Sequence, residues 1–343
     1  MKIWESRSPY KLRYWIAPVL FIFCGGNECN YAQAEDSVFD QYQRVADALL
    51  EISTVYELEG RWDDTISLLE HGIEIMKQGN FQKGKAQLQA FLGGIIWKRG
   101  HHQRALHILQ EAEQISTSLN DKKTLGMALY NIGEIFYIKK FLMQEEVGTK
   151  ALEYHKNALK ARQEVEDQKG VTHSLSRLGV IYERMADNTK ALEYYDKAIK
   201  ISEDISYMHG MTRPLTHIGV YHRRQGDWEK ALHYYEKALV INEKIGFKEG
   251  KVFAHGNVGQ AKYNLESDFD TSMSHYLKAL TFANELDFKL AIGRTLYLIS
   301  NLYQANGNRE KAIEYYGRTI DAVQEVGYKV FEELAQKQLR EIE

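Results

Sequence analysis

The sequence predicts an all-α fold, an α-solenoid in which about seven helical hairpins form a superhelix that ends in a C-terminal capping helix. Three observations support this prediction. Only 3 prolines among 343 residues leave few helix breakers, while 22 tyrosines and 13 phenylalanines supply large packing side chains. A phrase of about 40 residues recurs along most of the chain. Within each phrase, apolar residues recur at helical spacings of three and four.

The composition limits the classes of partner. The 44 basic and 47 acidic residues give a net charge of −3, so no global positive field draws the protein to nucleic acid. The 2 cysteines exclude a disulfide-built scaffold and a cysteine-rich zinc module. We therefore expect no nucleic-acid partner and no cofactor, and any basic site must be local.

Residues 1–34 have the pattern of an export signal. A basic segment precedes the uncharged apolar run Tyr14 to Gly26, which spans only about 20 Å as a helix, less than the ~30 Å hydrocarbon core of a bilayer. Ala32-Gln33-Ala34 is a small-x-small cleavage pattern. The prediction is a signal peptide cut after Ala34 and a periplasmic or secreted protein. The alternatives are a membrane anchor formed by the uncleaved segment, or a fortuitous apolar stretch on a cytoplasmic protein.

The repeats are defined by a small residue that follows an aliphatic one. Successive copies are 40, 40, 46, 40, 40 and 41 residues apart, with the small residue at Ser53, Gly93, Gly133, Gly179, Gly219, Gly259 and Ser300. A fixed period of this length is typical of a solenoid. We therefore expect a solenoid over residues 35–328 and a capping helix over 329–343. The longest spacing reflects a six-residue insertion after Lys140, and the spacing of 41 reflects one extra residue near Ser267.

The copy around Gly219 shows how each repeat is expected to fold. Its first helix carries Gly219 and ends at Gly226, after which Asp227 caps a second helix. Ala231 and Tyr235 lie on the apolar stripe of that second helix. The small residues let the two helices approach closely, and the tyrosine fills the space beside them. Such a hairpin cannot bury its apolar face alone, so neighbouring copies must stack.

This pattern resembles the tetratricopeptide repeat. In the fourth copy the motif residues are all in register, at Leu178, Gly179, Tyr182, Ala191, Tyr195 and Ala198. The period is about 40 instead of 34, and glycines mark the expected inter-repeat turns at 84, 170, 210 and 250. The first copy has Ser53, Thr65 and Gly72 at motif positions and is expected to be a terminal cap. Repeats of this length are similar to those of kinesin light chain, Leu-Gly-Asn-rich spindle adaptors and bacterial aspartate phosphatase regulators. The resemblance implies that a peptide or protein segment binds in a concave groove.

The sequence contains no phosphate-binding loop and none of the common hydrolase motifs, so we predict that the protein is not an enzyme. Its closest histidine clusters are His101-His102-x₄-His107 and His217-x₄-His222. Residues five apart do not share a helix face, and no carboxylate or thiol completes either set. We predict no metal site.

The first helix of each repeat carries the candidate binding residues. With the small residue counted as position 8, positions 2, 5, 9 and 12 form one face, distinct from the packing face at 7, 8 and 11. The fourth and fifth repeats place basic residues on or beside it: His173, Arg177, Arg184, Arg213, His217, Arg223 and Arg224. The flanking repeats add Tyr130, Asn131, Asn257, Tyr263, Asn264 and Asn301. Guanidinium groups suit carboxylates, which favours an acidic ligand or one with a free C-terminal carboxylate. In the alternative, the arginines pair with glutamates of neighbouring helices, such as Glu183 or Glu229.

The sequence allows two interpretations of the insertion and two of the function. The insertion Phe141 to Gly148 begins with three apolar residues, which either dock a partner or fold back as an extra turn. The protein is either an exported scaffold that binds a peptide, or a sensor that regulates a separate signalling enzyme.

Overall fold

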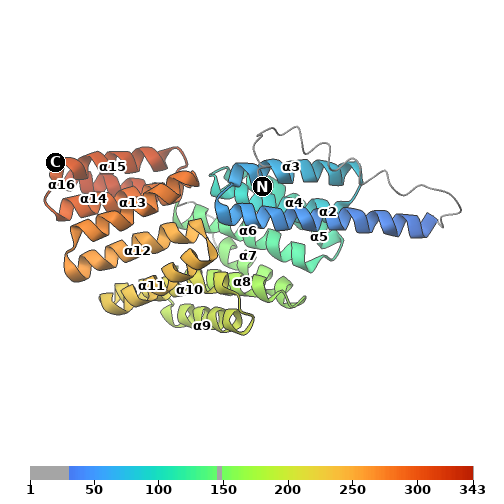
Figure 1. Ribbon diagram of the computed structural model, residues 1–343, viewed down its shortest axis with the longest axis horizontal. Coiled ribbons are helices and arrows are strands. Elements are labelled where there is room, and N and C mark those ends of the chain that lie inside the picture. The colour runs from blue at the N-terminus through green and yellow to red at the C-terminus, as the bar shows by residue number, and fades with distance from the viewer. Residues whose placement is uncertain (1–30, 145–148, 343) are drawn as a thin grey trace, which may run out of the picture. The chain divides into compact units, whose positions relative to one another are not determined.

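The structure is a computed structural model that describes residues 31–144 and 149–342. The described residues form fifteen helices and no strand, which confirms the predicted all-α solenoid (Figure 1). The helices pair as α2 (Tyr31–Glu59) with α3 (Trp62–Gln78), α4 (Gln82–Lys98) with α5 (His102–Ser118), α6 (Lys122–Phe141) with α7 (Lys150–Gln163), α8 (Gln168–Arg184) with α9 (Asn188–Asp204), α10 (Met208–Arg224) with α11 (Trp228–Ile245), α12 (Lys248–Glu266) with α13 (Phe269–Glu285), and α14 (Lys289–Ala305) with α15 (Arg309–Gln324), followed by α16 (Lys329–Ile342).

Residues from Tyr42 onward form one packed unit, and the start of α2 up to Gln41 lies outside it. The predicted signal segment lies almost wholly outside the described residues, so its cleavage stays a prediction. No helix of the described residues is long and apolar enough to cross a bilayer.

The small residue of each first helix faces a large side chain of the second helix. A Cβ atom added at Gly179 would lie 2.4 Å from the ring of Tyr195, and one at Gly219 would lie 2.5 Å from the ring of Tyr235. Both tyrosines are fully buried. Glycine is therefore needed at these positions because any side chain would collide with the ring.

Aspartates begin several of the helices, as predicted. The Asp227 carboxylate accepts a hydrogen bond from the backbone N–H of Lys230 at 3.1 Å, and Gly226 before it has φ of 79°. Asp187 caps α9 in the same way. These caps satisfy backbone donors that the helix itself leaves free.

The glycines expected in the inter-repeat turns lie elsewhere. Gly210 and Gly250 occupy the first turn of α10 and α12, where an added Cβ would lie 2.4 Å from Ser202 Oγ and 2.1 Å from Asn242 Oδ1. They allow one repeat to approach the next. The left-handed backbone of the turn before α10 is carried by Ser206, at φ of 54°.

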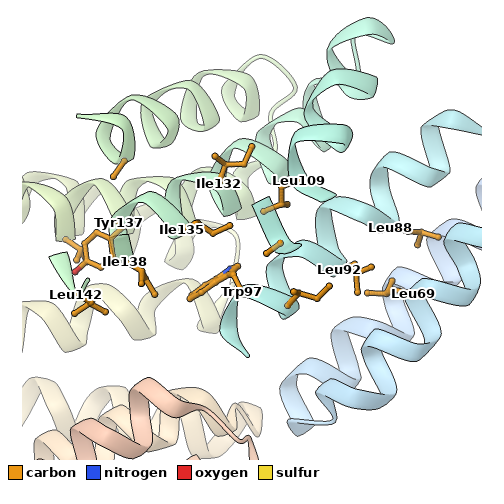
Figure 2. Close-up of a cluster of buried hydrophobic side chains, with 14 of the residues drawn as sticks. Leu69, Leu88, Leu92, Trp97, Leu109, Ile132, Ile135, Tyr137, Ile138 and Leu142 are labelled. Atoms are coloured by element: carbon orange, nitrogen blue, oxygen red, sulfur yellow. The ribbon is translucent and has the colours of Figure 1, made fainter. Parts of the chain in front are cut away.

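The hydrophobic core runs continuously through the first five repeats (Figure 2). Leu69 and Leu88 belong to α3 and α4, and Ile132 and Ile138 continue the core into α6. The same core includes Tyr328, from the turn before α16. The turn before α16 therefore packs against the core of the early repeats.

The start of the insertion, Phe141 to Met143, packs on this core, and residues 145–148 lie outside the described residues. The Phe141 ring packs 5.0 Å from that of Tyr137, and Leu142 is buried. The Leu142 carbonyl accepts a hydrogen bond from the backbone N–H of Val330 at 3.2 Å. The insertion thus also docks a segment, and that segment belongs to the C-terminal end of the same chain.

Candidate functional site

The first helices of successive repeats pack side by side from α4 to α14. The surface formed by positions 2, 5, 9 and 12 of these helices, together with the residues beside them, is called the inward face below. Figure 1 shows these helices following one another through the solenoid. Most of the predicted basic residues lie on this face. The structure brings them together with acidic and tyrosine side chains that the sequence prediction did not include.

The first group centres on Glu134 of α6. Its carboxylate forms an ion pair with Arg177 of α8, and both side chains are buried. The Arg177 guanidinium also lies 4.7 Å from the centre of the Tyr137 ring. Arg184 donates a hydrogen bond to the Tyr137 hydroxyl at 3.3 Å. Arg177 is therefore in a structural ion pair, whereas Arg184 is exposed and bonded only to a phenol.

The second group centres on Glu183, also on α8. Its carboxylate accepts hydrogen bonds from Tyr195 at 2.8 Å and His217 at 2.9 Å, and it pairs with Arg224 at 2.9 Å. Burial alone would raise the pKa of Glu183, but these partners outweigh it and lower the pKa to about 2. Glu183 is thus ionised at neutral pH and neutralises Arg224, as the alternative interpretation of the arginines proposed.

The third group joins three first helices. Arg213 of α10 donates a hydrogen bond to the Tyr130 hydroxyl of α6 at 2.6 Å. The Tyr130 ring also contacts Arg162, whose guanidinium carbon lies 4.7 Å from the ring centre. His173 of α8 shares a 2.9 Å hydrogen bond with Tyr207. Burial, followed by the neighbouring cationic groups, holds the pKa of His173 well below its usual range, so this imidazole is neutral at pH 7.

The fourth group is a pair of arginines, Arg223 and Arg294, without an acidic partner. Arg294 of α14 donates to the Asn257 amide oxygen at 2.5 Å, and its other terminal nitrogen is buried without an acceptor. The buried Tyr235 hydroxyl faces the charges of Arg223 and Arg294, which counteract the rise in its pKa caused by burial. Burial and then the repulsion from Arg223 contribute to lowering the pKa of Arg294 to about 10. Two cations thus lie near each other with only neutral partners.

The remaining predicted residues make structural contacts. Asn131 donates to the backbone carbonyl of Ala90 at 3.0 Å, and Asn301 accepts from Tyr316 at 2.6 Å. Asn264 is exposed and bonds to its own helix, and Tyr263 packs against a hydrophobic cluster of the sixth and seventh repeats. In the described part of the chain, no group of three His, Cys, Asp or Glu residues is arranged to hold a metal ion.

Contacts between distant repeats close the solenoid on itself, and these contacts are called the seam below. In its first region, Lys98 of α4 pairs with Glu57 at 2.8 Å and with Glu249 of α12 at 2.7 Å. Trp62 packs edge-on against Phe288, with ring centres 5.7 Å apart, and both are buried. Residues 151 positions apart in the sequence are thus directly bonded.

The second region of the seam joins the end of α4 and the end of α6 to the C-terminal turn. Tyr328 is buried and lies 6.2 Å from the His102 ring, between ring centres. A Cβ atom added at Gly100 would lie 3.7 Å from Val326 Cβ. The hydrogen bond between Leu142 and Val330 belongs to this region.

Comparison with known proteins agrees with the fold. Tetratricopeptide repeat models match residues 140–204, 211–285 and 293–321. Together with the seven stacked hairpins, these matches identify the chain as a tetratricopeptide repeat protein. No curated protein sequence matches the chain.

Solved structures show the same fold at low sequence identity. The Rap conjugation gene regulator of plasmid pLS20, in complex with the Phr* peptide, is 14% identical with a TM-score of 0.65, covering 94% of this chain and 86% of that one. A Rap protein complexed with competence and sporulation factor is 12% identical with a TM-score of 0.62, covering 97% and 91%. The tetratricopeptide sensor protein PH0952, a signal transduction ATPase from Pyrococcus horikoshii, is 17% identical with a TM-score of 0.51, covering 94% of this chain and 50% of that one. These structures share the helical solenoid fold of this chain.

The sequence prediction missed Glu134, Glu249 and Lys98. Glu134 follows the anchor Gly133 and so occupies position 9 of the face used to select candidates, which is a signal that could have identified it. Lys98 occupies position 13 of its repeat, the position of Arg184 and Arg224, so the same numbering could have selected it. No comparable signal exists for Glu249, because its contact with Lys98 depends on how far the whole solenoid turns.

Proposed function

We propose that the protein is an exported scaffold that binds a peptide or protein segment on the inward face, through an acidic side chain or a free C-terminal carboxylate of the ligand. The proposal rests on four arginines of the inward face that have no acidic partner. Among the described residues, Arg184, Arg213, Arg223 and Arg294 have no carboxylate within ion-pair distance, and the first two donate only to tyrosine hydroxyls.

Arginines without an acidic partner are suited to receive one. A phenol or amide oxygen neutralises no charge, so a carboxylate that reaches these guanidinium groups gains a charge-assisted hydrogen bond. Arg184 is exposed and Arg213 and Arg223 are half-buried, so a ligand has access to them. The Rap conjugation gene regulator of pLS20 is described in complex with the Phr* peptide, which supports a peptide as the ligand class for this fold.

The proposal is tested by retention of synthetic random nonapeptides on the purified protein, read by mass spectrometry. We expect retained peptides to be enriched in Asp and Glu, or to lose binding when the C-terminus is amidated. The double variant Arg184→Glu/Arg223→Glu should lose this retention at unchanged circular dichroism. The control Lys200→Glu/Lys244→Glu makes the same charge change on exposed positions of α9 and α11 and should retain the peptides.

Salt dependence adds a second criterion. Charge pairs that are partly exposed are screened over about 8 Å at physiological ionic strength, so retention should fall as salt rises. Equal retention by the wild type and by Arg184→Glu/Arg223→Glu would show that these arginines do not bind the peptides.

A regulatory role is the second candidate, and the seam favours it. Because the seam joins distant repeats, a ligand that alters it would change the spacing of surfaces offered to a partner enzyme. Crosslinked pull-down from native cells, with and without an acidic peptide, separates the two functions. A signalling enzyme captured in only one of the two states would favour regulation.

A further inference from the structure

The fourth repeat shows how this fold holds a carboxylate on its inward face. The Tyr195 ring of α9 lies against Gly179 of α8. Its hydroxyl donates to Glu183, one helical turn after that glycine, at 2.8 Å. His217 of the next first helix, α10, lies 2.9 Å from the same carboxylate. The carboxylate thus lies between two neighbouring first helices and accepts the proton of a buried tyrosine.

The fifth repeat has the same framework with the opposite charge. The Tyr235 ring lies against Gly219, and the residue one helical turn after this glycine is Arg223. A guanidinium group only donates hydrogen bonds, so Arg223 cannot accept the tyrosine proton as Glu183 does in the fourth repeat. Tyr235 is fully buried, and its hydroxyl proton has no acceptor among the residues that the structure describes.

The seventh repeat supports this comparison. There the Tyr316 hydroxyl donates to Gln304, which lies one helical turn after Ser300. The glutamine oxygen accepts the proton as a carboxylate does. Of these three repeats, only the fifth places at this position a group that cannot accept. The fifth repeat therefore departs from the pattern of its own chain, and such departures occur where another requirement acts.

The neighbouring first helices also provide cations and no acid at this place. Asn257 of α12 occupies the repeat position of His217, so the repeat places it across from Arg223. The Asn257 amide oxygen accepts a hydrogen bond from Arg294 of α14 at 2.5 Å. The other terminal nitrogen of Arg294 is buried, has no acceptor in the described part of the chain, and lies 3.2 Å from where a Cβ at Gly256 would be. Burial lowers the pKa of Arg294 to about 10, which leaves the group charged at neutral pH.

We infer that a ligand carboxylate binds between α10, α12 and α14, at the place that Glu183 occupies in the fourth repeat. There it accepts the Tyr235 proton and pairs with Arg223 and Arg294. This inference rests on the proposed function, and it names which arginines of the inward face hold the acidic group of the ligand. Arg223 is half-buried and has no carboxylate partner among the described residues, so rotation of its side chain admits the ligand.

The first experiment supplies the missing carboxylate from the chain itself. Arg223→Glu should give Tyr235 an acceptor and Arg294 a counter-ion, and should raise the melting temperature by about 2 to 4 °C, measured by circular dichroism. The matched control is Arg224→Glu, which replaces a 2.9 Å pair with Glu183 by a repulsion and should lower the melting temperature. Both variants place a negative charge at the end of α10, so the difference between them reports the local partners. An Arg223→Glu protein that melts no higher than the wild type would overturn the inference.

The second experiment measures binding by isothermal titration with two acetylated probes. Hexaglutamate with an amidated C-terminus offers side-chain carboxylates, and hexaserine with a free C-terminus offers a terminal one, so the wild type shows which source is bound. Tyr235→Phe should weaken that binding about threefold to tenfold, and Arg294→Gln about tenfold or more. The matched control Tyr195→Phe removes the corresponding hydroxyl of the fourth repeat, which already donates to Glu183, and should leave the affinity unchanged.

The outcomes separate the inference from the proposed function. Binding that is equal in the wild type, Tyr235→Phe and Arg294→Gln would overturn this site and leave the proposed function standing on Arg184 and Arg213. Failure of the wild type to bind either probe would overturn the proposed function and the inference with it. Loss of binding in Arg223→Glu, together with its higher melting temperature, would support the site, because the introduced carboxylate then stabilises the fold and excludes the ligand.

Discussion

Replacing Gly219 with alanine tests the packing of the fifth repeat directly. The added methyl would lie 2.5 and 2.7 Å from two carbons of the Tyr235 ring and 3.2 Å from the Ala231 carbonyl oxygen. Tyr235 is fully buried and therefore has little room to move, and the carbonyl belongs to the backbone of α11. Relief requires a shift of α10 against α11.

The magnitude follows from two opposing effects. Alanine is favoured over glycine in a helix by about 0.5 to 1 kcal/mol, while overpacking a close contact costs about 1 to 3 kcal/mol. The net loss centres on about 1 kcal/mol and reaches about 2.5 kcal/mol at most, which corresponds to a fall in melting temperature of about 1 to 4 °C for a domain of this size. Leucine at the same position should cost more, because its larger side chain cannot fit between the helices.

Gly317 provides the matched control. It lies inside α15, and an added Cβ there would meet no atom within 4 Å. Gly317→Ala should therefore raise the melting temperature by about 1 to 3 °C through helix propensity alone. Circular dichroism melts of both variants decide the matter. A Gly219→Ala protein that melts at or above the wild-type temperature would show that the predicted close approach of the two helices is wrong.

Three further predictions address charge and processing. Glu183 has a folded pKa of about 2, below its ordinary value of about 4.3. Its ionised form therefore stabilises the fold by about 3 kcal/mol at neutral pH, and this contribution is lost as pH falls from about 4.5 to 2. The difference in melting temperature between wild type and Glu183→Gln should shrink over that range. Lys98→Met leaves the carboxylates of Glu57 and Glu249 without their partner and should cost about 3 kcal/mol or more at pH 7, measured by urea denaturation. N-terminal sequencing of the native protein should begin at Glu35, and an intact Met1 would contradict export.

The repeats could be predicted from sequence because their causes are local. Gly219, Asp227 and Tyr235 each act within one hairpin, through close helix contact, capping and filling of the space beside the glycine. These requirements recur every 40 residues, so each copy supports the interpretation of the others. The helix pairs and the order of their stacking follow from that periodicity.

The inward charges were predicted only in part. Position numbering placed Arg177 and Arg224 beside the inward face, but it does not say which charge faces which across neighbouring helices. The structure pairs Arg177 with Glu134 and Arg224 with Glu183, whereas Arg184 finds only a tyrosine. Whether an arginine is neutralised depends on side-chain geometry between repeats, which a single-repeat pattern does not contain.

The longer irregularity of the repeat pattern and the turn before the capping helix meet at the second region of the seam. The insertion after Lys140 extends the sequence beyond α6 and supplies Leu142, and the turn before the capping helix supplies Tyr328 and Val330. A capping helix that served only to cover the last repeat would need contacts with α14 and α15 alone. Here the segment that leads into it also reaches the end of α6, so it closes the solenoid as well as ending it. A sequence usually departs from a consistent local pattern where another requirement acts. At this place the requirement is contact between repeats three and seven, and the same closure sets Glu249 against Lys98.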